Sequence, residues 1–136
     1  MIVDASVLLC AFFPDEKQIQ AQALIRDHVT GRIRLVAPTL ILYEVTNAVV
    51  QAVRRERITD EQGEDILTAF DGLGIGMEPV TWQQVWPLAH RFDRSAYDAA
   101  YLALAEARGE TLVTGDLRMY NAVRDHLDWV RWIGSD

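Results

Sequence analysis

Short apolar runs alternate with longer helical patterns along the whole chain, and this alternation limits its fold more than any other feature. The runs have the composition of buried β-strands, and they lie at residues 1–4, 33–37, 75–80, 111–114 and 128–133. Strands separated by helices pair in parallel, with helices packed on both faces of the sheet. The sequence therefore predicts an α/β fold with a central parallel sheet of four or five strands.

Local signals mark where the intervening helices begin and end. Capping boxes are predicted at Asp15 with Gln18, Thr59 with Gln62, Thr81 with Gln84, and Ser95 with Asp98. Glycines stand where helices should end before strands, at Gly31, at Gly74 with Gly76, and at Gly109. The chain has 136 residues, 50% of them hydrophobic, which suits one ordinary core. We expect a single domain over residues 1–136.

The composition argues against several classes of protein. No apolar run is long enough to span a membrane, and the apolar start lacks a basic segment and is interrupted by Asp4, so neither an anchor nor a signal peptide is predicted. We therefore expect a cytoplasmic protein. The formal net charge of −7 argues against loose electrostatic binding to DNA, and no direct DNA binding is expected. Lys17 is the only lysine, which disfavours mechanisms that need a phosphate-binding lysine.

Carboxylates follow two of the predicted strands. Asp4 ends the first strand in "MIVDAS", and Asp116 ends "LVTGD". The ligand crevice of an open parallel sheet lies at the carboxyl ends of its strands, so both acids should lie at the functional edge. Asp98 occupies the first turn of the helix "SAYDAAYLALAEA", whose alanines let that helix lie close against the sheet. Its carboxylate is expected near the same edge.

Glu44 is a fourth acid of interest because it is the only charged residue in the apolar stretch "TLILYEVTNAVVQAV". The helix that contains it is predicted over about residues 39–57. An unpaired buried carboxylate costs several kcal/mol or takes up a proton, so Glu44 needs a partner. Asn47 lies one turn further along the same helical face.

Each acid also has a purely structural explanation. Asp4 and Asp116 are placed to cap the helices that follow them, and Asp98 is placed to complete the capping box of Ser95. Glu44 has the weakest explanation of this kind. We expect a shared site because two strand-end carboxylates, a first-turn acid and an acid in an apolar helix occur in one chain.

Electrostatics sets the chemistry of such a site. Two carboxylates about 5 Å apart repel by roughly 3 kcal/mol at an effective dielectric constant near 20. Either one acid takes up a proton, or a divalent cation neutralises the cluster. A donor set made only of oxygen favours Mg²⁺, with Mn²⁺ as a substitute, over Zn²⁺. One or two such ions could activate water and stabilise a phosphoryl transition state.

Ser6 and Thr114 each lie two residues from an aspartate. They could orient a carboxylate or a water molecule, and helix capping or strand packing explains them equally well. Arg94 and Arg118 adjoin two of the acids in sequence.

The segments "MIVDAS", "LYEVTNAV" and "SAYDAAYLALAEARGETLVTGD" together resemble the PIN-domain ribonucleases, specifically the VapC-type toxins of toxin–antitoxin pairs. The resemblance spans nearly the whole chain. It implies a metal site made of Asp4, Glu44, Asp98 and Asp116, supported by Ser6, Asn47 and Thr114. It also implies Mg²⁺-dependent cleavage of RNA, a homodimer, and an antitoxin whose tail occupies the active-site groove. With RNA as the expected substrate, Arg94 and Arg118 are expected to bind its backbone, although exposed arginines near helix ends are ordinary.

A noncatalytic role remains open on sequence grounds. The same fold could serve only to dock a protein partner, with its acids structural or metal-holding. An aromatic interface could come from four tryptophans: Trp82, Trp86, Trp129 and Trp132. The complete set of four acids favours catalysis, since a protein that had lost its enzymatic activity need not have kept all four.

Overall fold

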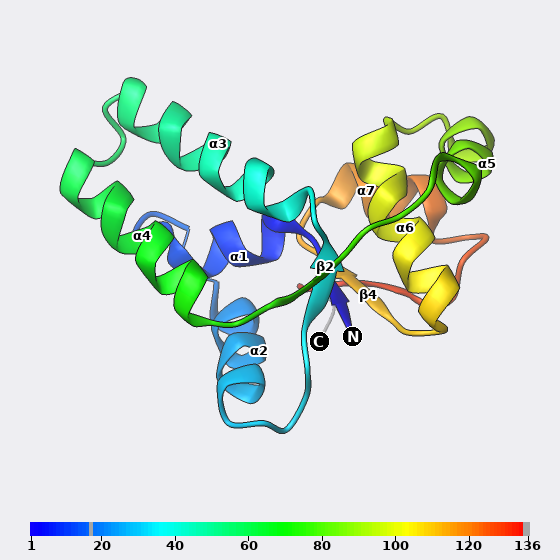
Figure 1. Cartoon of the computed structure of the whole chain (residues 1–136), viewed down its shortest axis with the longest axis horizontal. Coiled ribbons are helices and arrows are strands. Elements are labelled where there is room, and N and C mark those ends of the chain that lie inside the picture. The colour runs from blue at the N-terminus through cyan, green and yellow to red at the C-terminus, as the bar shows by residue number, and fades with distance from the viewer. Residues whose placement is uncertain (17, 135–136) are drawn as a thin grey trace.

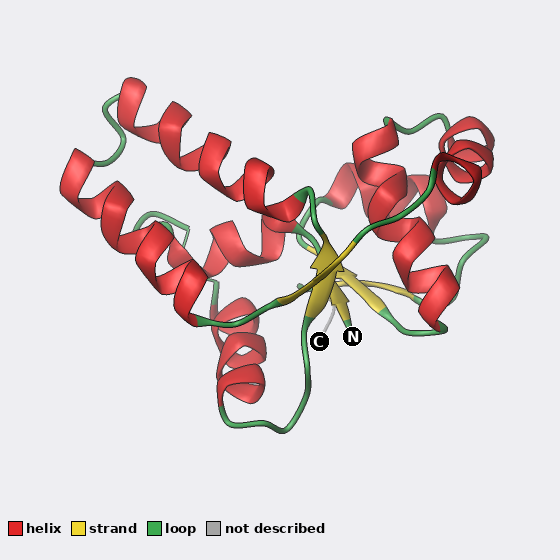
Figure 2. Ribbon diagram, in the orientation of Figure 1, coloured by secondary structure: helices red, strands yellow, loops and turns green. Residues whose placement is uncertain are grey.

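The computed structural model describes residues 1–16 and 18–134, and within them it contains one parallel sheet of five strands (Figures 1 and 2). The strands are β1 (Ile2–Val3), β2 (Val36–Pro38), β3 (Gly76–Glu78), β4 (Leu112–Thr114) and β5 (Val130–Trp132). Each falls within or across the edge of a predicted run, and the predicted α/β class is confirmed. Lys17 and the last two positions of the predicted 1–136 domain lie outside the described residues.

Seven helices are present among the described residues. They are α1 (Ala5–Phe12), α2 (Ile19–Val29), α3 (Ile41–Arg54), α4 (Asp60–Gly72), α5 (Trp82–Phe92), α6 (Ala96–Arg108) and α7 (Leu117–Val123). Figure 1 shows α1 to α4 on one side of the sheet and α5 to α7 on the other. Within the described residues, no helix combines the length and the apolar character that a membrane crossing needs.

The strand order β3-β2-β1-β4-β5 decides where a ligand crevice can form. The chain moves outward from β1 through β2 to β3, and then returns to place β4 on the other side of β1. All neighbouring strands are parallel, and Val3 of β1 pairs with Val113 of β4. The order therefore reverses between β1 and β4, and in open α/β sheets ligands bind at such a point, beyond the carboxyl ends of the strands.

The sheet is buried on both faces, which explains why its strands are continuous apolar runs rather than alternating ones. Ile2, Val3, Leu112 and Val113 are all completely buried. On one face α6 contributes an unbroken series of buried residues, 99–105. Three of the alanines expected to allow this close packing are buried, Ala99, Ala100 and Ala103, whereas Ala96 is exposed.

Helices α3 and α4 form a hairpin that extends away from the sheet (Figure 1). A small second core holds the hairpin against the end of α1, and its members are Phe13, Val49, Ala52, Ile58 and Ile66. Gly63 of α4 lies at the contact, where a Cβ atom would approach Val49 Cγ1 to 3.1 Å. The hairpin thus has a core of its own.

The predicted capping boxes have different outcomes. The Thr59–Gln62 and Thr81–Gln84 boxes are confirmed in full. Only half of the Ser95–Asp98 box forms, with the Ser95 hydroxyl accepting from the Asp98 amide at 3.1 Å. The Asp98 carboxylate is therefore available for other contacts.

The Asp15–Gln18 box is wrong. Helix α2 begins at Ile19 with Gln18 as its N-cap, and the Gln18 side chain accepts from the Ala21 amide. Asp15 instead pairs with Arg57, which lies far away in sequence. This ion pair is a tertiary contact that no local pattern encodes.

Three of the predicted glycine ends are confirmed, since Gly31, Gly74 and Gly109 all have positive φ. The prediction that Gly76 ends a helix is wrong, because Gly76 is the first residue of β3. At Gly109, φ is 63° and the residue closes α6, a conformation that costs little only for glycine.

Replacing Gly109 by Ala should lower the free energy of unfolding by about 1 kcal/mol, because a Cβ atom is strained at positive φ. Gly72→Ala is the matched control, since Gly72 is a helical residue with open space where its Cβ would lie. The control should be neutral or stabilising by up to about 1 kcal/mol. Urea denaturation measures both variants, and equal effects would contradict the assignment of the α6 C-terminus.

Candidate active site

The four predicted acids line one small pocket at the carboxyl edge of the sheet. This pocket has a volume of about 140 Å³, and its lining includes Asp4, Glu44, Asp98 and Asp116. Asp4 directly follows β1, Glu44 lies in α3, Asp98 lies in α6, and Asp116 comes two residues after β4. The structure therefore brings together carboxylates that are separated by more than half of the chain.

Asp4 is the most deeply buried of these acids, and its side chain is held from three directions. Its Oδ1 accepts from the Ser6 hydroxyl at 2.5 Å and from the Val7 amide at 3.4 Å. Its Oδ2 accepts from the Thr114 hydroxyl at 2.5 Å. Asp4 is thus the N-cap of α1 and also the link between β1 and β4 at the point where the strand order reverses.

Burial raises the pKa of Asp4. Removal from water raises the pKa of Asp4 to about 6, and the hydrogen bonds from Ser6 and Thr114 oppose this rise only in part. The charge of Asp116 makes a smaller contribution to the same rise. An ionised Asp4 therefore destabilises the folded protein unless positive charge is supplied nearby.

Asp116 is the N-cap of α7. Its Oδ1 accepts from the amides of Arg118 at 3.0 Å and Met119 at 3.2 Å. Its Oδ2 accepts no hydrogen bond from the residues that the structure describes, so one carboxylate oxygen is left for the pocket. Capping and a role in the site are therefore compatible for Asp116.

Gly115 allows β4 and α1 to approach closely beside the acids. Its amide donates to the Ser6 hydroxyl at 2.8 Å, and a Cβ atom at this position would lie 3.1 Å from that same oxygen. Thr114 completes the arrangement, because its hydroxyl accepts from the Asp116 amide at 3.0 Å while donating to Asp4. Ser6 and Thr114 thus fix the backbone and the carboxylates of both strand ends.

Glu44 has the partner that its apolar surroundings require, and the partner is Tyr101. The Tyr101 hydroxyl donates to Glu44 Oε1 at 2.5 Å, and the tyrosine is only 3% exposed. Burial raises the pKa of Glu44, the Tyr101 hydrogen bond opposes the rise, and the charge of Asp98 adds to it. The pKa of Tyr101 is also raised, by burial and by its bond to Glu44, so its hydroxyl remains a donor.

Sequence reasoning missed Tyr101. The available signal was its position three residues after Asp98, which places both on one face of α6. Asn47 was the residue expected beside Glu44, but it is exposed on α3 and does not line the pocket. The supporting role of Asn47 stays a prediction.

Asp98 faces the pocket beside a cation. Burial raises the pKa of Asp98, the positive charge of Arg94 opposes this, and Asp116 contributes a further rise. Arg94 Nε lies 3.5 Å from Asp98 Oδ2, and another nitrogen of its guanidinium donates to the Arg118 carbonyl at 3.3 Å. Arg94 thus joins the edge of the acid cluster, while the Arg118 side chain is exposed next to it.

The pocket suits a hard divalent cation in its donor chemistry. Asp4, Glu44 and Asp98 all have raised pKa values, each in part because another member of the cluster is negatively charged. Among the residues that the structure describes, no three His, Cys, Asp or Glu side chains form a ready-made metal-binding group. Mg²⁺ does not need such a group, because it usually takes one or two carboxylates and keeps several waters. The four acids could hold an ion of this kind.

Comparison with known proteins identifies the fold and its family. The family model described as the PIN domain matches residues 1–125, and the chain belongs to this family. Relatives include a VapC ribonuclease of Mycobacterium bovis, which is 34% identical over 121 residues, covering 88% of this chain and 87% of the relative. Ribonuclease VapC3 of Pyrobaculum aerophilum is 28% identical over 123 residues, covering 88% and 91%.

A solved structure agrees with this assignment at the level of fold. The crystal structure of PAE2754 from Pyrobaculum aerophilum matches with a TM-score of 0.75 at 23% identity, covering 97% of this chain and 82% of that one. The family model and the 34% identical VapC relative confirm the family predicted from the sequence motifs.

Asp4→Asn should raise the stability of the protein at pH 8 in the presence of a chelator by up to about 3 kcal/mol, given a folded pKa of about 6 against 3.8. The folded state holds the Asp4 proton more tightly than the unfolded state, so ionisation above pH 6 destabilises the wild type. As the pH falls through 6 toward 3.8, the difference between the variant and the wild type should vanish.

Urea denaturation at pH 8, 6 and 4 measures this difference, with Asp125→Asn as the control on an exposed acid. A wild type that matches or exceeds Asp4→Asn in stability at pH 8 would refute the proposed burial of charge.

Tyr101→Phe should leave the fold intact and raise the pKa of Glu44, because it removes the hydrogen bond that opposes the effect of burial. Tyr97→Phe is the matched control, since Tyr97 is 65% exposed on the same helix. Titration of the Glu44 side-chain carboxyl resonance by NMR reports both. An unchanged Glu44 pKa in Tyr101→Phe would mean that the hydrogen bond is absent in solution.

Proposed function

We propose that this protein is a Mg²⁺-dependent endoribonuclease, the toxin of a VapBC-type toxin–antitoxin pair, and that it hydrolyses RNA phosphodiesters at the four-carboxylate pocket. The observation that carries the proposal is the convergence of Asp4, Glu44, Asp98 and Asp116 on one pocket at the strand-order reversal. Membership of the PIN-domain family and relatives named as VapC ribonucleases support RNA as the substrate class.

In this proposal the four acids hold Mg²⁺, with Mn²⁺ as a substitute. The bound ion supplies Lewis acidity, which activates water and offsets the charge that develops on the phosphate. Raised pKa values at Asp4, Glu44 and Asp98 support the proposal, because a divalent cation relieves the repulsion that contributes to them.

The remaining polar residues would keep the acids in place. Ser6 and Thr114 bind both oxygens of Asp4, so this carboxylate cannot rotate without breaking a hydrogen bond. Tyr101 restrains Glu44 in the same way. Preorganised groups of this kind avoid reorganisation during the reaction.

Two arginines at the pocket edge would bind the RNA backbone. Arg94 is anchored by Asp98 and by the Arg118 carbonyl, which gives its guanidinium a defined position. The Arg118 side chain is exposed beside Asp116 and would contact a neighbouring phosphate. Asn47, exposed one turn beyond Glu44, is retained as a supporting residue.

The proposed partners follow from the same assignment. An antitoxin would inhibit the enzyme by covering the acid pocket, and two copies of the chain would form a homodimer. The protein would act in the cytoplasm, where such an RNA substrate would be found. Relatives named VapC support the antitoxin.

A noncatalytic docking module is the second candidate, and exposed aromatic side chains favour it. Trp82 and Trp86 are 72% and 61% exposed on α5, whereas Trp129 and Trp132 pack partly against the core. Two such side chains on one helical face are typical of a protein interface. A docking surface on α5 is compatible with catalysis at the acids, so only an activity measurement separates the two candidates.

Asp98→Asn and Asp116→Asn should each reduce cleavage of single-stranded RNA by about 100-fold or more, because even residues that only support metal ligands are typically worth 10- to 100-fold. The assay uses the purified full chain without partner, a labelled RNA, and Mg²⁺, Mn²⁺ or chelator. Cleavage by the wild type should require the metal.

Asp125→Asn is the control for the loss of a carboxylate, and far-ultraviolet circular dichroism verifies that the variants fold. Cleavage that persists in chelator, or full activity in both site variants, would reject the metal mechanism at these acids. No cleavage by the folded wild type with either metal would favour the docking module.

A further inference from the structure

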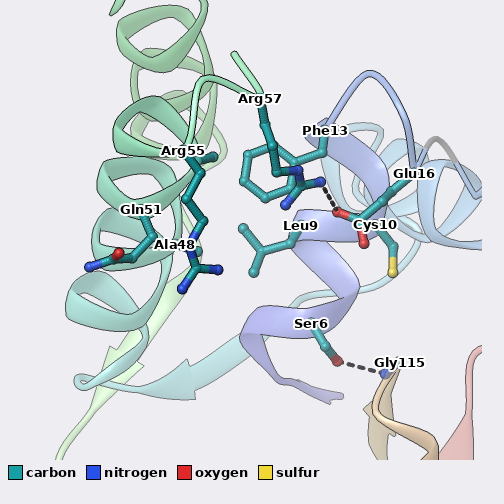
Figure 3. A pocket seen from close by; sticks show the side chains of 11 residues that line it. Ser6, Leu9, Cys10, Phe13, Glu16, Ala48, Gln51, Arg55, Arg57 and Gly115 are labelled. Carbon is teal, nitrogen blue, oxygen red and sulfur yellow. Dashed lines mark hydrogen bonds and ion pairs between the residues drawn. The ribbon is translucent and has the colours of Figure 1, made fainter. Parts of the chain in front are cut away.

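A second cavity of about 320 Å³ lies beside the acid pocket, between α1 and α3 (Figure 3). Helix α1 and the segment after it contribute Ser6, Leu9 and Phe13 to its lining, and α3 contributes Ala48 and Gln51. Its size and its mixture of apolar walls with a few polar groups are typical of sites for small molecules or parts of larger ligands. The acid chemistry described above does not use it.

The two cavities share Ser6. The hydroxyl of Ser6 donates to Asp4 in the acid pocket and accepts from the Gly115 amide, and Gly115 lines the second cavity. Figure 3 shows Ser6 and Gly115 together at one end of the cavity. A polymeric ligand bound at the acids would therefore place its neighbouring unit in this cavity.

One face of α3 runs along both cavities. Glu44 lines the acid pocket, and Ala48, Gln51 and Arg55 line the second cavity at the successive helical spacings of 4, 3 and 4 residues. The face thus begins with a carboxylate at the acids and ends with a cation. In the direction of α3, a polyanion held at the acids by a metal would find its next positive charge at Arg55.

The charges around the cavity leave Arg55 uncompensated. Glu16 is the acidic residue of the lining, and it pairs with Arg57. Arg57 also pairs with Asp15 and lies over the Phe13 ring at 5.0 Å. Arg55 has no ion pair with any residue that the structure describes, and Figure 3 shows its side chain extending along α3 toward Ala48. Phosphate is the anion that complements such a position in a nuclease.

We infer that this cavity is a nucleotide subsite, which receives the base next to the scissile phosphate of single-stranded RNA. The inference rests on the proposed function. The base would lie against the apolar wall of Leu9 and Ala48, the amide of Gln51 would hydrogen-bond its edge, and Arg55 would bind its phosphate. Recognition of unpaired bases by apolar contact together with polar side chains is usual in RNA-binding proteins. The subsite would make cleavage sensitive to the base at one flanking position.

The test measures RNA binding without cleavage. The full chain carrying Asp98→Asn is titrated in chelator with a fluorescein-labelled single-stranded RNA of mixed sequence, and anisotropy is recorded. Ala48→Phe, which fills the cavity, and Arg55→Ala should each weaken binding by about tenfold, the order expected for one bound nucleotide. Arg55→Ala should also reduce the slope of log affinity against log salt by about 1.

Two controls match these variants. Arg54→Ala removes another exposed arginine, one residue earlier and outside the lining, and Ala107→Phe adds the same ring at an exposed position of α6. Both should bind the RNA like the parent protein. Thermal unfolding of Ala48→Phe verifies that it folds.

A measurement on the unmodified chain is independent of any variant. Titration with each of the four nucleoside 5′-monophosphates should shift the amide resonances of Leu9, Ala48 and Gln51, and one base should shift them at the lowest concentration.

The outcomes separate this inference from the proposed function. Metal-dependent cleavage by the wild type, together with RNA binding by Ala48→Phe and Arg55→Ala equal to that of the controls, would overturn the subsite and leave the nuclease standing. The subsite would also be overturned if Ala48→Phe and Arg55→Ala bound RNA normally but no longer bound a protein partner. That result would assign the cavity to a peptide. Nucleotide shifts in the cavity without any RNA cleavage would support the subsite and reject the nuclease.

Discussion

Repulsion among carboxylates at the junction of β1 and β4 is the constraint on which the rest of the structure depends. The strand order reverses at this junction, so Asp4 and Asp116 leave adjacent strands at the same edge of the sheet. Helices α3 and α6 add Glu44 and Asp98 to the same pocket. The fold tolerates this concentration of negative charge by hydrogen-bonding Asp4 twice through hydroxyls and Glu44 once. Such a site is less stable alone than with a cation.

In the proposed mechanism, folding and chemistry use the same atoms. Asp4 caps α1 and Asp116 caps α7, and each cap satisfies backbone amides that would otherwise lack a partner. One oxygen of Asp116 accepts from both amides, and the residue also lines the acid pocket. The hydrogen bonds of a helix cap also hold the capping carboxylate in a fixed position at the pocket. The structural and the functional explanations of these residues are therefore complementary.

The α3–α4 hairpin gives the acid pocket an extension. Its own small core attaches it to α1, and the cavity between α1 and α3 lies beside that core. Negative charge at Glu44 changes to positive charge at Arg55 along one face of α3. This gradient suits a ligand whose reacting phosphate is held through a cation at the acids and whose next phosphate needs a side-chain cation. Substrate preference would then depend on α1 and α3, and catalysis on the strand ends.

Local sequence determined the fold class and the edge of the sheet at which two of the acids lie. Apolar runs separated by helical segments are sufficient to specify a parallel α/β sheet, and acids at the ends of "MIVD" and "LVTGD" had to lie at its carboxyl edge, because parallel strands all end there. Only the tertiary structure decided the strand order, the pairing of Tyr101 with Glu44, and the pairing of Asp15 with Arg57. These contacts join residues more than 40 positions apart. Helical and strand periodicity describes only near neighbours, so it carries no information about which distant side chains will meet.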